Sequence, residues 1–473
     1  MVTAQQPPSP SVSNRDAVAA LWQCTGLDDA PLDWLKLAGS DAVLPSSFAA
    51  ATAAQASIAA AGLAAAMLWR ERGGRPQTVA VDRRHAVAEF RSERYLLVDG
   101  APPADPWDRI AGAYRCGDGR WIRLHTNFPH HRDGVLAILG CEHDKASVAQ
   151  ALLGWEAEAF ETAASARGMV VAAMRSFAEW DAHPQAAALA GLPIFSLERI
   201  GEAPAAPLPP AERPLSGVKV LDLTRVIAGP VCGRTLAAHG ADVLAISSSK
   251  LPSIPALVID TSRGKHNAYL DLTEASDRVQ LRALLGATDV FVQGYRPGGL
   301  AAKGFGPEEA ASVRPGIVYV SLSAYGHLGP WADKRGFDSL VQTACGFNHA
   351  EMSAFGENAP RPLPMQVLDH ASGYLMALGA MAALARRARE GGSWHVRVSL
   401  AQTAQWLRGL GRPVDGLAAT DFSAEEITAW RQISASGFGE LSAIHHAAKL
   451  SATPAHWPLP SMPLGSAPAA WWE

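Results

Sequence analysis

The fold class is decided by LSGVKVLDLTRVIAGPVCGRTLAAHGADV, residues 215–243. An apolar strand pattern over 218–223 runs into a turn with Gly229, a helical pattern over 228–240 and a second strand pattern over 241–246. A strand, a helix and a strand in this order predict a βαβ unit with parallel strands.

The same alternation continues toward the C-terminus. The pattern predicts a short extended piece at 269–272, a helix at 276–287 and strands at 289–295 and 316–326. The predicted fold class is therefore α/β, with a Rossmann-like, doubly wound parallel sheet. No GxGxxG and no Walker lysine loop occurs, which argues against NAD, FAD and ATP.

Composition is that of an ordinary globular protein. The chain has 473 residues, 48% hydrophobic and 18% charged, with a formal net charge of -4. The length predicts two or three domains, and the share of hydrophobic residues excludes a largely disordered chain. The net charge gives no indication of nucleic-acid binding. Five cysteines without a CxxC pair, and no recognisable signal peptide, predict a reducing cytoplasm. The apolar run 48–69 contains Thr52, Gln55 and Ser57, so we interpret it as a buried helix and expect no membrane span.

Shifts in composition predict the domain organisation. A Pro/Ser/Gln-rich N-terminus is expected to be disordered, a hairpin at 113–126 belongs to a smaller α+β domain, and a Pro-rich linker precedes the parallel sheet. The expected segments are 1–15 (disordered), 16–100 (helix–strand segment completing the large domain, with a helix at 46–69 and a strand at 78–81), 101–201 (small domain), 202–214 (linker), 215–410 (large domain) and 411–473 (C-terminal tail).

The chain contains an internal sequence repeat. LDHASGYLMALGAMAALARRAREGGSWHVRVSLAQTA (368–404) and ATAAQASIAAAGLAAAMLWRERGGRPQTVAVDRRHA (51–86) both combine a small-residue helix, a Gly-Gly turn and a V-x-V strand. Aligning the Gly pairs places Asp369 opposite Ala51, and aligning the strands places it opposite Thr52. Duplication explains the match better than chance similarity between two alanine-rich helices.

Several charged residues are candidates for chemistry. Asp369 stands at the start of an apolar helix that has no further acid until Glu390, where a carboxylate either caps the helix or acts chemically. Five cations are expected on loops near strand ends, where they suit phosphate groups or form a solvated surface: Arg225, Arg263, Lys265, Arg296 and Lys303.

The sequence resembles the family III CoA-transferases, which include formyl-CoA and carnitine CoA-transferases. Six ordered blocks carry the resemblance over about 214–410: 215–243, 261–272, 289–306, 317–331, 335–346 and 368–384. In the family, the aspartate before the glycine-containing helix is the nucleophile, and here that residue is Asp369. The hairpin and the stretch 166–188 resemble the family's small domain, which normally follows the helix, so the chain is expected to be permuted or fused and trimmed.

The resemblance also implies a binding site for coenzyme A. Ala228 and Gly229 fall in the loop beside the CoA thiol, and Tyr295, Arg296 and Lys303 match positions around the adenosine and its phosphates. Arg335 matches a basic CoA-contacting position. The chain departs from the family at Ala245-Ile246-Ser247, which puts a phosphate contact near Ser248 in doubt, and it has no clear glycine-rich flap. The resemblance implies acyl-CoA and carboxylic acid as substrates, no permanently bound cofactor or metal, and a homodimer.

Three functions compete. The first is CoA transfer through aspartyl anhydride and aspartyl-CoA intermediates on Asp369, with an oxyanion held by backbone N–H groups at the start of the 371–388 helix or in the 226–229 loop. The second is an acyl-CoA racemase or isomerase. Racemases of this superfamily carry a histidine where this chain has Phe337, and racemisation needs a base on each face of the carbon. The third is a non-catalytic CoA-binding relative.

Overall fold

The computed structural model describes residues 11–39, 42–296 and 298–472, and a seven-stranded sheet forms its centre. The order across the sheet is β10-β9-β8-β11-β12-β13-β7. The first six strands are parallel and β7 is antiparallel to β13. The bounds are β7 (Phe195–Gly201), β8 (Lys219–Leu223), β9 (Asp242–Ser247), β10 (Lys265–Tyr269), β11 (Val290–Gln293), β12 (Val318–Ser323) and β13 (Ser393–Ser399).

The parallel sheet predicted from the alternating pattern is confirmed. Counted along the chain, the six parallel strands lie in the order 3-2-1-4-5-6, so the order reverses between β8 and β11. One strand was misplaced: the extended piece expected at 269–272 lies at Lys265–Tyr269. Lys265 and Asn267 point inward there, so the strand lacks the apolar run that would have revealed it.

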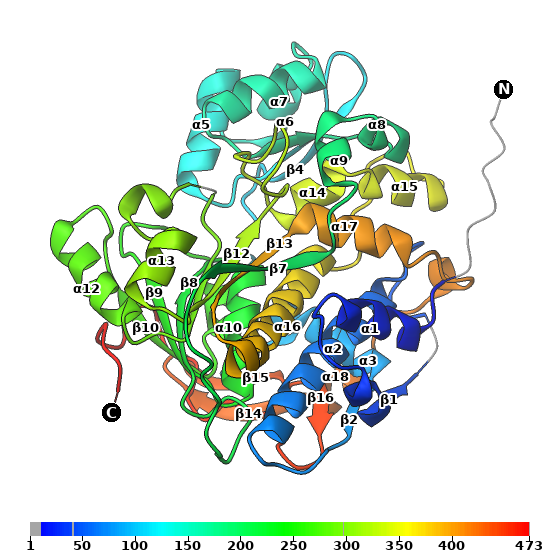
Figure 1. The fold of residues 1–473 in the computed structure, drawn as a ribbon. Helices are drawn as coiled ribbons and strands as arrows, with labels where there is room; N and C mark the ends of the chain where they lie inside the picture. Colours follow the sequence, from blue (N-terminus) through cyan, green and yellow to red (C-terminus); the bar gives the residue numbers. More distant parts are fainter. Residues whose placement is uncertain (1–10, 40–41, 297, 473) are drawn as a thin grey trace.

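Helices cover both faces of this sheet (Figure 1). On one face, Val220, Val292 and Val320 join the large core formed with α10 (Ala228–Ala238) and α16 (Val367–Glu390). On the other, Leu221 and Phe291 pack with residues of α12 (Ala275–Leu285) and α13 (Pro307–Val313). Successive residues of a strand thus enter the cores on opposite faces, as expected of a sheet that is buried on both faces.

Helix α16 lies at the centre of the fold. Its residues are buried from Val367 to Ala385, and it packs on α10, on α2 (Ala50–Glu71) and on β12, β13 and β7. The contact with α10 is close because of Gly373. A Cβ there would lie 2.5 Å from the carbonyl oxygen of Ala228 and 2.8 Å from the Cβ of Val231.

The earlier copy of the repeat, α2 and β2 (Val79–Asp82), folds in the same way as α16 and β13. Helix α2 leads into β2, which has β1 (Leu35–Ala38) as a parallel neighbour and β16 (Ala448–Leu450) as an antiparallel one. Helix α16 leads into β13, which has β12 and β7 in the same relation. Residues 16–100 therefore contribute β1 and β2 to a separate three-stranded sheet, which β16 completes and which joins the large domain through the packing of α2 on α16.

The predicted hairpin is confirmed in a second small sheet, β4-β5-β6, at the top of Figure 1. Its strands are β4 (Gly112–Arg115), β5 (Trp121–Leu124) and β6 (Val171–Ala173), and they share a core with α5 (Pro129–Leu139), α6 (Lys145–Leu152) and α7 (Ala157–Ala166). Further helices of the chain are α1 (Asn14–Gln23), α3 (Arg83–Glu89), α4 (Ser92–Tyr95), α11 (Pro255–Thr261), α14 (Asp338–Ala344) and α17 (Leu400–Gly409).

Part of the N-terminal stretch expected to be disordered is helical, and the Pro-rich linker is held by hydrogen bonds. Residues 1–10 lie outside the described residues, but α1 begins at Asn14, inside the stretch expected to be disordered. In the linker, Arg72 donates to the carbonyls of Pro209, Pro214 and Ser216 at 2.8–3.0 Å, because prolines leave carbonyls without partners in the linker itself.

The C-terminal region is also more than a tail. It contains α18 (Ala424–Ala429), β14 (Arg431–Ser436), β15 (Gly439–Ile444) and β16. β15 pairs with β3 (Leu97–Val98), and β16 completes the β1-β2-β16 sheet. Both ends of the chain therefore contribute to one body.

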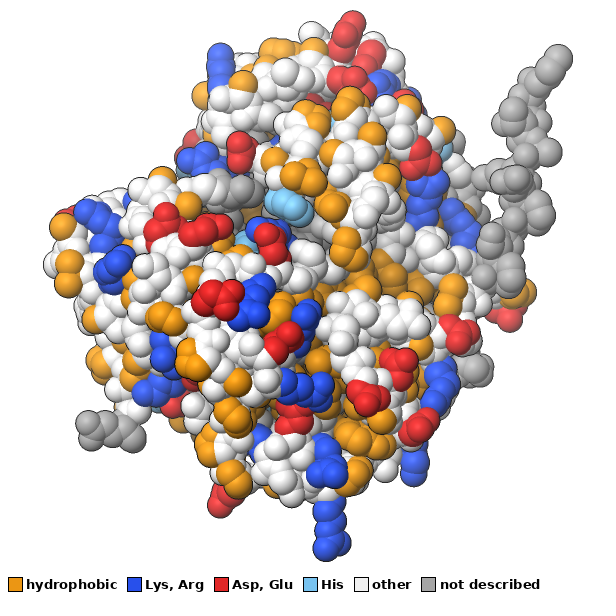
Figure 2. All heavy atoms as spheres, viewed as in Figure 1, with side chains coloured by type: hydrophobic (Ala, Val, Ile, Leu, Met, Phe, Trp, Pro, Cys, Tyr) orange, Lys and Arg blue, Asp and Glu red, His pale blue; other side chains and the backbone are white. Residues whose placement is uncertain are grey.

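Two helices, Ala50–Glu71 and Val367–Glu390, have the length and apolarity of a membrane span, and both are buried inside the fold. The interpretation of 48–69 as a buried helix is confirmed. Figure 2 shows charged side chains of both signs scattered over one face of the molecule.

The close contact of α16 with α10 can be tested by Gly373→Ala. The added Cβ meets backbone on α10, so we expect the free energy of unfolding to fall by about 1–3 kcal/mol in urea denaturation. Gly409→Ala in α17 is the matched control, because a Cβ there meets nothing within 4 Å and costs no stability. Equal stability of the two variants would contradict the tight packing.

Candidate active site

Asp369 is the third residue of α16 and 7% exposed. The helix begins at Val367 after Gln366, so the alternative that Asp369 is the N-cap is wrong. Within the described residues, no hydrogen bond reaches its carboxylate. Asp369 is therefore a buried acid with free oxygens in the first turn of a long helix.

The cap of α16 comes from another element. Asp338, the first residue of α14, accepts hydrogen bonds from the backbone N–H groups of Leu368 (2.7 Å) and Asp369 (3.0 Å). The amide of Gln342 donates to the other oxygen of Asp338. A carboxylate bound to helix N–H groups fixes the first turn and, with it, the position of the Asp369 side chain.

The two aspartates form a like-charged buried pair. Burial raises the pKa of Asp369 well above its ordinary value, and the charges of Asp338 and Glu93 raise it further. Burial raises the pKa of Asp338 to about 6, although the hydrogen bonds from Asp369 and Gln342 oppose the rise. Of the two, Asp338 is better stabilised as an anion, because its oxygens are hydrogen-bonded.

A third acid reaches the site from the N-terminal segment. Glu93 of α4 lies 3.2 Å from Nε2 of His370, whose ring stacks on Phe90 with 5.2 Å between centroids. Burial alone would raise the pKa of Glu93, but the hydrogen bond and charge of His370 and the charge of Arg94 hold it below its ordinary value. The residue after Asp369 is thus held by a residue from the other end of the chain.

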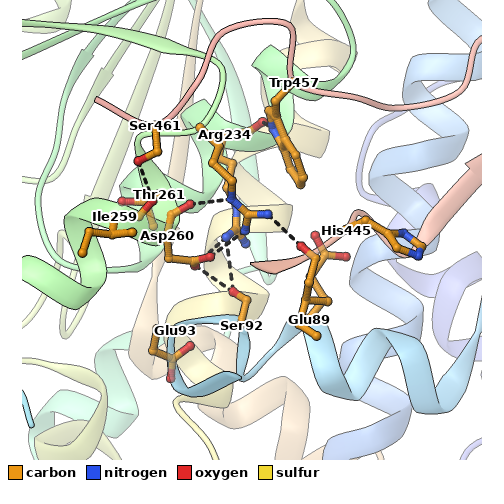
Figure 3. A network of polar contacts seen from close by, with 12 residues as sticks. Glu89, Ser92, Glu93, Arg234, Ile259, Asp260, Thr261, His445, Trp457 and Ser461 are labelled. Carbon is orange, nitrogen blue, oxygen red and sulfur yellow. Dashed lines mark hydrogen bonds and ion pairs between the residues drawn. The ribbon is translucent and has the colours of Figure 1, made fainter. Parts of the chain in front are cut away.

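A buried ion network anchors α4 beside the site (Figure 3). Asp260 of α11 pairs with Arg234 of α10 at 2.5 Å and accepts a hydrogen bond from Ser92 at 2.7 Å. Arg263 pairs with the other oxygen of Asp260 at 2.5 Å. All four side chains are almost fully buried, so the network ties the N-terminal segment to the sheet domain.

Two of the predicted phosphate-binding cations are placed elsewhere than expected. Arg263 also donates to the carbonyl of Ile444 at 2.7 Å, and Lys265 donates to Asp222 at 2.9 Å and to the carbonyl of Pro230 at 2.8 Å. Both are buried. The expectation that they contact phosphate is wrong, because each already neutralises an internal aspartate.

The loop before α10 is strained, and together with the first two residues of that helix it carries free N–H donors. Val226 has φ 75°, an uncommon conformation for a β-branched residue. Within the described chain, the backbone N–H groups of Val226, Ile227, Ala228 and Gly229 have no acceptor. Asp369 and Gly373 share a face of α16, and Gly373 touches the carbonyl of Ala228, so this loop lies on the side of α16 that carries Asp369.

The remaining predicted CoA contacts lie near the carboxyl ends of the strands. Arg296 and Arg335 line one cavity of about 430 Å³ between the small domain and the loop after β12. Tyr295 follows β11 and, with Arg296, lines a second cavity of about 170 Å³. Lys303 is exposed, and its Nζ lies 3.3 Å from the carbonyl oxygen of Leu272.

Sequence reasoning missed two residues of the site. Asp338 stands in a recognised block but was not chosen, although an acid at the start of a helix is a signal for N–H binding. Glu93 carries no sequence signal, since its role comes from tertiary packing. In the part of the chain that the structure describes, no group of three or more His, Cys, Asp or Glu is placed to hold a metal.

Residues 215–413 match CoA-transferase family III. The chain carries a family III CoA-transferase domain. That domain contains β8 to β13, α10, α16 and both aspartates of the pair.

Curated relatives of the family III domain are CoA-transferases by name. Acetyl-coenzyme A transferase nodX of Hypoxylon pulicicidum is 38% identical over 208 residues, 43% of this chain and 35% of the relative. An acyl-CoA transferase of Gibberella moniliformis is 30% identical over 365 residues, 68% of this chain and 64% of the relative. A probable fatty acyl-CoA transferase of Mycobacterium tuberculosis is 32% identical over 209 residues, 41% of this chain and 52% of the relative. The chain thus spans between about one third and two thirds of these relatives.

The like-charged pair of the family III domain predicts a stability effect with a definite sign. A carboxyl whose pKa is raised by folding stabilises the fold below its unfolded pKa, and this contribution is lost as the pH rises through the folded value. Asp369→Asn should therefore raise the melting temperature at pH 8, by about 1–3 °C, and have little effect near pH 4. Glu390→Gln at the other end of α16 is the control, and a lower melting temperature for Asp369→Asn at pH 8 would refute the pairing.

Proposed function

We propose that this chain transfers coenzyme A from an acyl-CoA to a carboxylic acid with Asp369 as the nucleophile. One observation carries the proposal. The carboxylate of Asp369 is buried and has no hydrogen bond within the described residues, while Asp338 fixes its backbone. A carboxylate without donors, beside another negative charge, is more basic and more nucleophilic than a solvated one.

The chemistry proceeds by exchange of anions. An oxygen of Asp369 attacks the thioester carbonyl of the donor, the C–S bond breaks, and a mixed anhydride and CoA thiolate result. The thiolate attacks the aspartyl carbonyl of the anhydride, which releases the donor acid and leaves an aspartyl-CoA thioester. The acceptor carboxylate then displaces the thiolate, and the thiolate attacks the acceptor's carbonyl and releases Asp369.

Each step consumes one anion and forms another, so the cycle requires no proton transfer. The site needs a free carboxylate and donors for the oxyanion that forms at each attacked carbonyl. This agrees with the position of His370, the residue after Asp369, whose Nε2 lies against Glu93 and is not available as a base.

The geometry favours the 226–229 loop as the source of those donors. Asp338 already occupies the N–H groups of Leu368 and Asp369, so the start of α16 has fewer to offer. The four N–H groups at 226–229 have no acceptor within the described residues, and the strained Val226 holds them in place. Each such donor contributes roughly 3 kcal/mol to stabilising the transition state.

Coenzyme A would bind at the carboxyl ends of β8 and β11, where the strand order reverses. Ligands of Rossmann-like, doubly wound sheets bind at such reversal points. Arg225 follows β8 and Arg296 follows β11, and the cavity of Arg296 and Arg335 adds room for phosphates. The homodimer and the cytoplasmic location remain predictions.

The residue before Asp338, where racemases carry a histidine, does not support the alternative of a racemase. Phe337 stacks on His125 of the small domain with 3.9 Å between ring centroids. Burial and, to a smaller extent, the charge of Arg123 lower the pKa of His125 to about 3. This aromatic pair supplies no second base at neutral pH.

Covalent trapping tests the nucleophile. Incubation with a panel of acyl-CoAs and labelled acids, followed by hydroxylamine, should give a hydroxamate on Asp369 that mass spectrometry of peptides locates. Asp369→Asn should lose the hydroxamate and at least about 1,000-fold in exchange rate, because the covalent route is removed. Glu390→Gln should retain both. If Asp369→Asn keeps its exchange activity, the proposal fails.

The pH profile tests the role of Asp338. Exchange requires ionised Asp369, whose raised pKa places the acidic limb of the kcat/KM profile above the ordinary aspartate value of about 3.9. Asp338→Asn removes a negative charge and retains an oxygen for the helix N–H groups, so the limb should move to lower pH. A limb that stays in place, with activity retained, would show that Asp338 does not act through its charge.

A further inference from the structure

Arg123 of the small domain is a half-buried arginine with no anionic partner. It lies on β5, where its cross-strand neighbours are Ala113 on β4 and Ala172 on β6. Both neighbours are alanines, whose side chains offer the guanidinium no hydrogen-bond acceptor on that face of the sheet. The opposite face of the sheet, which carries Ile122 and Leu124, packs on the small domain's own core.

The guanidinium of Arg123 makes no hydrogen bond and no ion pair within the described residues. Its Nε is sealed from solvent and has no acceptor, and its closest aromatic contact is the Trp107 ring at 5.9 Å. Other buried arginines of this chain are paired: Arg175 lies 2.6 Å from Glu161, and Arg234 and Arg263 share Asp260. A buried donor without a partner is costly unless a ligand supplies the acceptor.

The face of β5 that carries Arg123 is turned toward the proposed active site. His125 lies two residues further along the chain, and it stacks on Phe337, the residue before Asp338. Burial lowers the pKa of Arg123, while the nearby charge of Asp338 opposes the change. Asp338 is not a partner for the guanidinium, because its oxygens accept from Leu368, Asp369 and Gln342.

We propose that Arg123 binds a second carboxylate of the acid substrate, so that the chain prefers dicarboxylic acids and their mono-CoA thioesters. This inference rests on the proposed CoA transfer at Asp369. The reacting carboxylate of the acid loses its charge in the anhydride and in the thioester, whereas a distal carboxylate stays ionised throughout. The distal carboxylate therefore complements the positive charge of Arg123 in every intermediate, and the planar guanidinium can bind a carboxylate with two hydrogen bonds.

Acceptors of matched length test the preference. Butanedioate and butanoate serve as probes, and exchange is followed with a CoA donor that the wild-type protein uses in the trapping experiment. The wild-type kcat/KM should favour butanedioate, and Arg123→Gln should reduce that value by about 10–100-fold while leaving the butanoate value within a few-fold. Arg123→Lys should recover part of the preference. Arg115→Gln, an exposed arginine on β4 of the same sheet, should behave as wild type.

Stability provides a readout independent of turnover. Arg123→Gln removes an unpaired buried charge, so its melting temperature should equal or exceed that of the wild type, and butanedioate should stabilise only the wild-type protein against heat. Equal use of both acids by the wild type, or an unchanged preference in Arg123→Gln, would overturn the inference and leave the CoA transfer standing. Absence of a hydroxamate on Asp369 with every acyl-CoA would overturn the CoA transfer itself.

Discussion

The fold is organised by the burial of α16 between α10, α2 and the central sheet. A helix that is apolar on all sides must be covered on all sides, and α16 contributes small residues that let its neighbours approach. Gly373 brings the backbone of α10 into contact. Because Asp369 lies one turn before Gly373 on the same face, the packing that covers the helix also aims the acid toward the 226–229 loop.

The acids at the site are separated from the buried arginines nearby. Three acids, Asp369, Asp338 and Glu93, lie around the first turn of α16, while Arg234 and Arg263 are bound to Asp260. Asp369 is thus left without a cation of its own. In the proposed reaction, formation of an uncharged anhydride or thioester on Asp369 would relieve this repulsion, which would favour the covalent intermediates over the free carboxylate.

The parts of the fold governed by local pattern were predictable, and those governed by distant contacts were not. Strand and helix periodicity gave β8, β9, α10 and the hairpin, because each segment alternates or repeats on its own. The start of α16 was expected at 371, four residues late, since the cap is supplied by Asp338, 31 positions from Asp369 in sequence. Arg263 and Lys265 looked like loop cations because Asp260 and Asp222, which bind them, become neighbours only when the sheet forms.

The echo of α16 in α2 explains why a chain with two such helices has one candidate nucleophile. Both helices feed a strand with one parallel and one antiparallel neighbour, but the sheet around β2 ends at three strands. It therefore lacks the strand-order reversal where a ligand would bind. In the alignment of the strands, the residue opposite Asp369 is Thr52, which is hydrogen-bonded to Asn14 of α1 at 3.2 Å, a structural contact. An acid there would have no strand-order reversal beside it and would only add buried charge, so α2 serves as the apolar surface against which α16 is held.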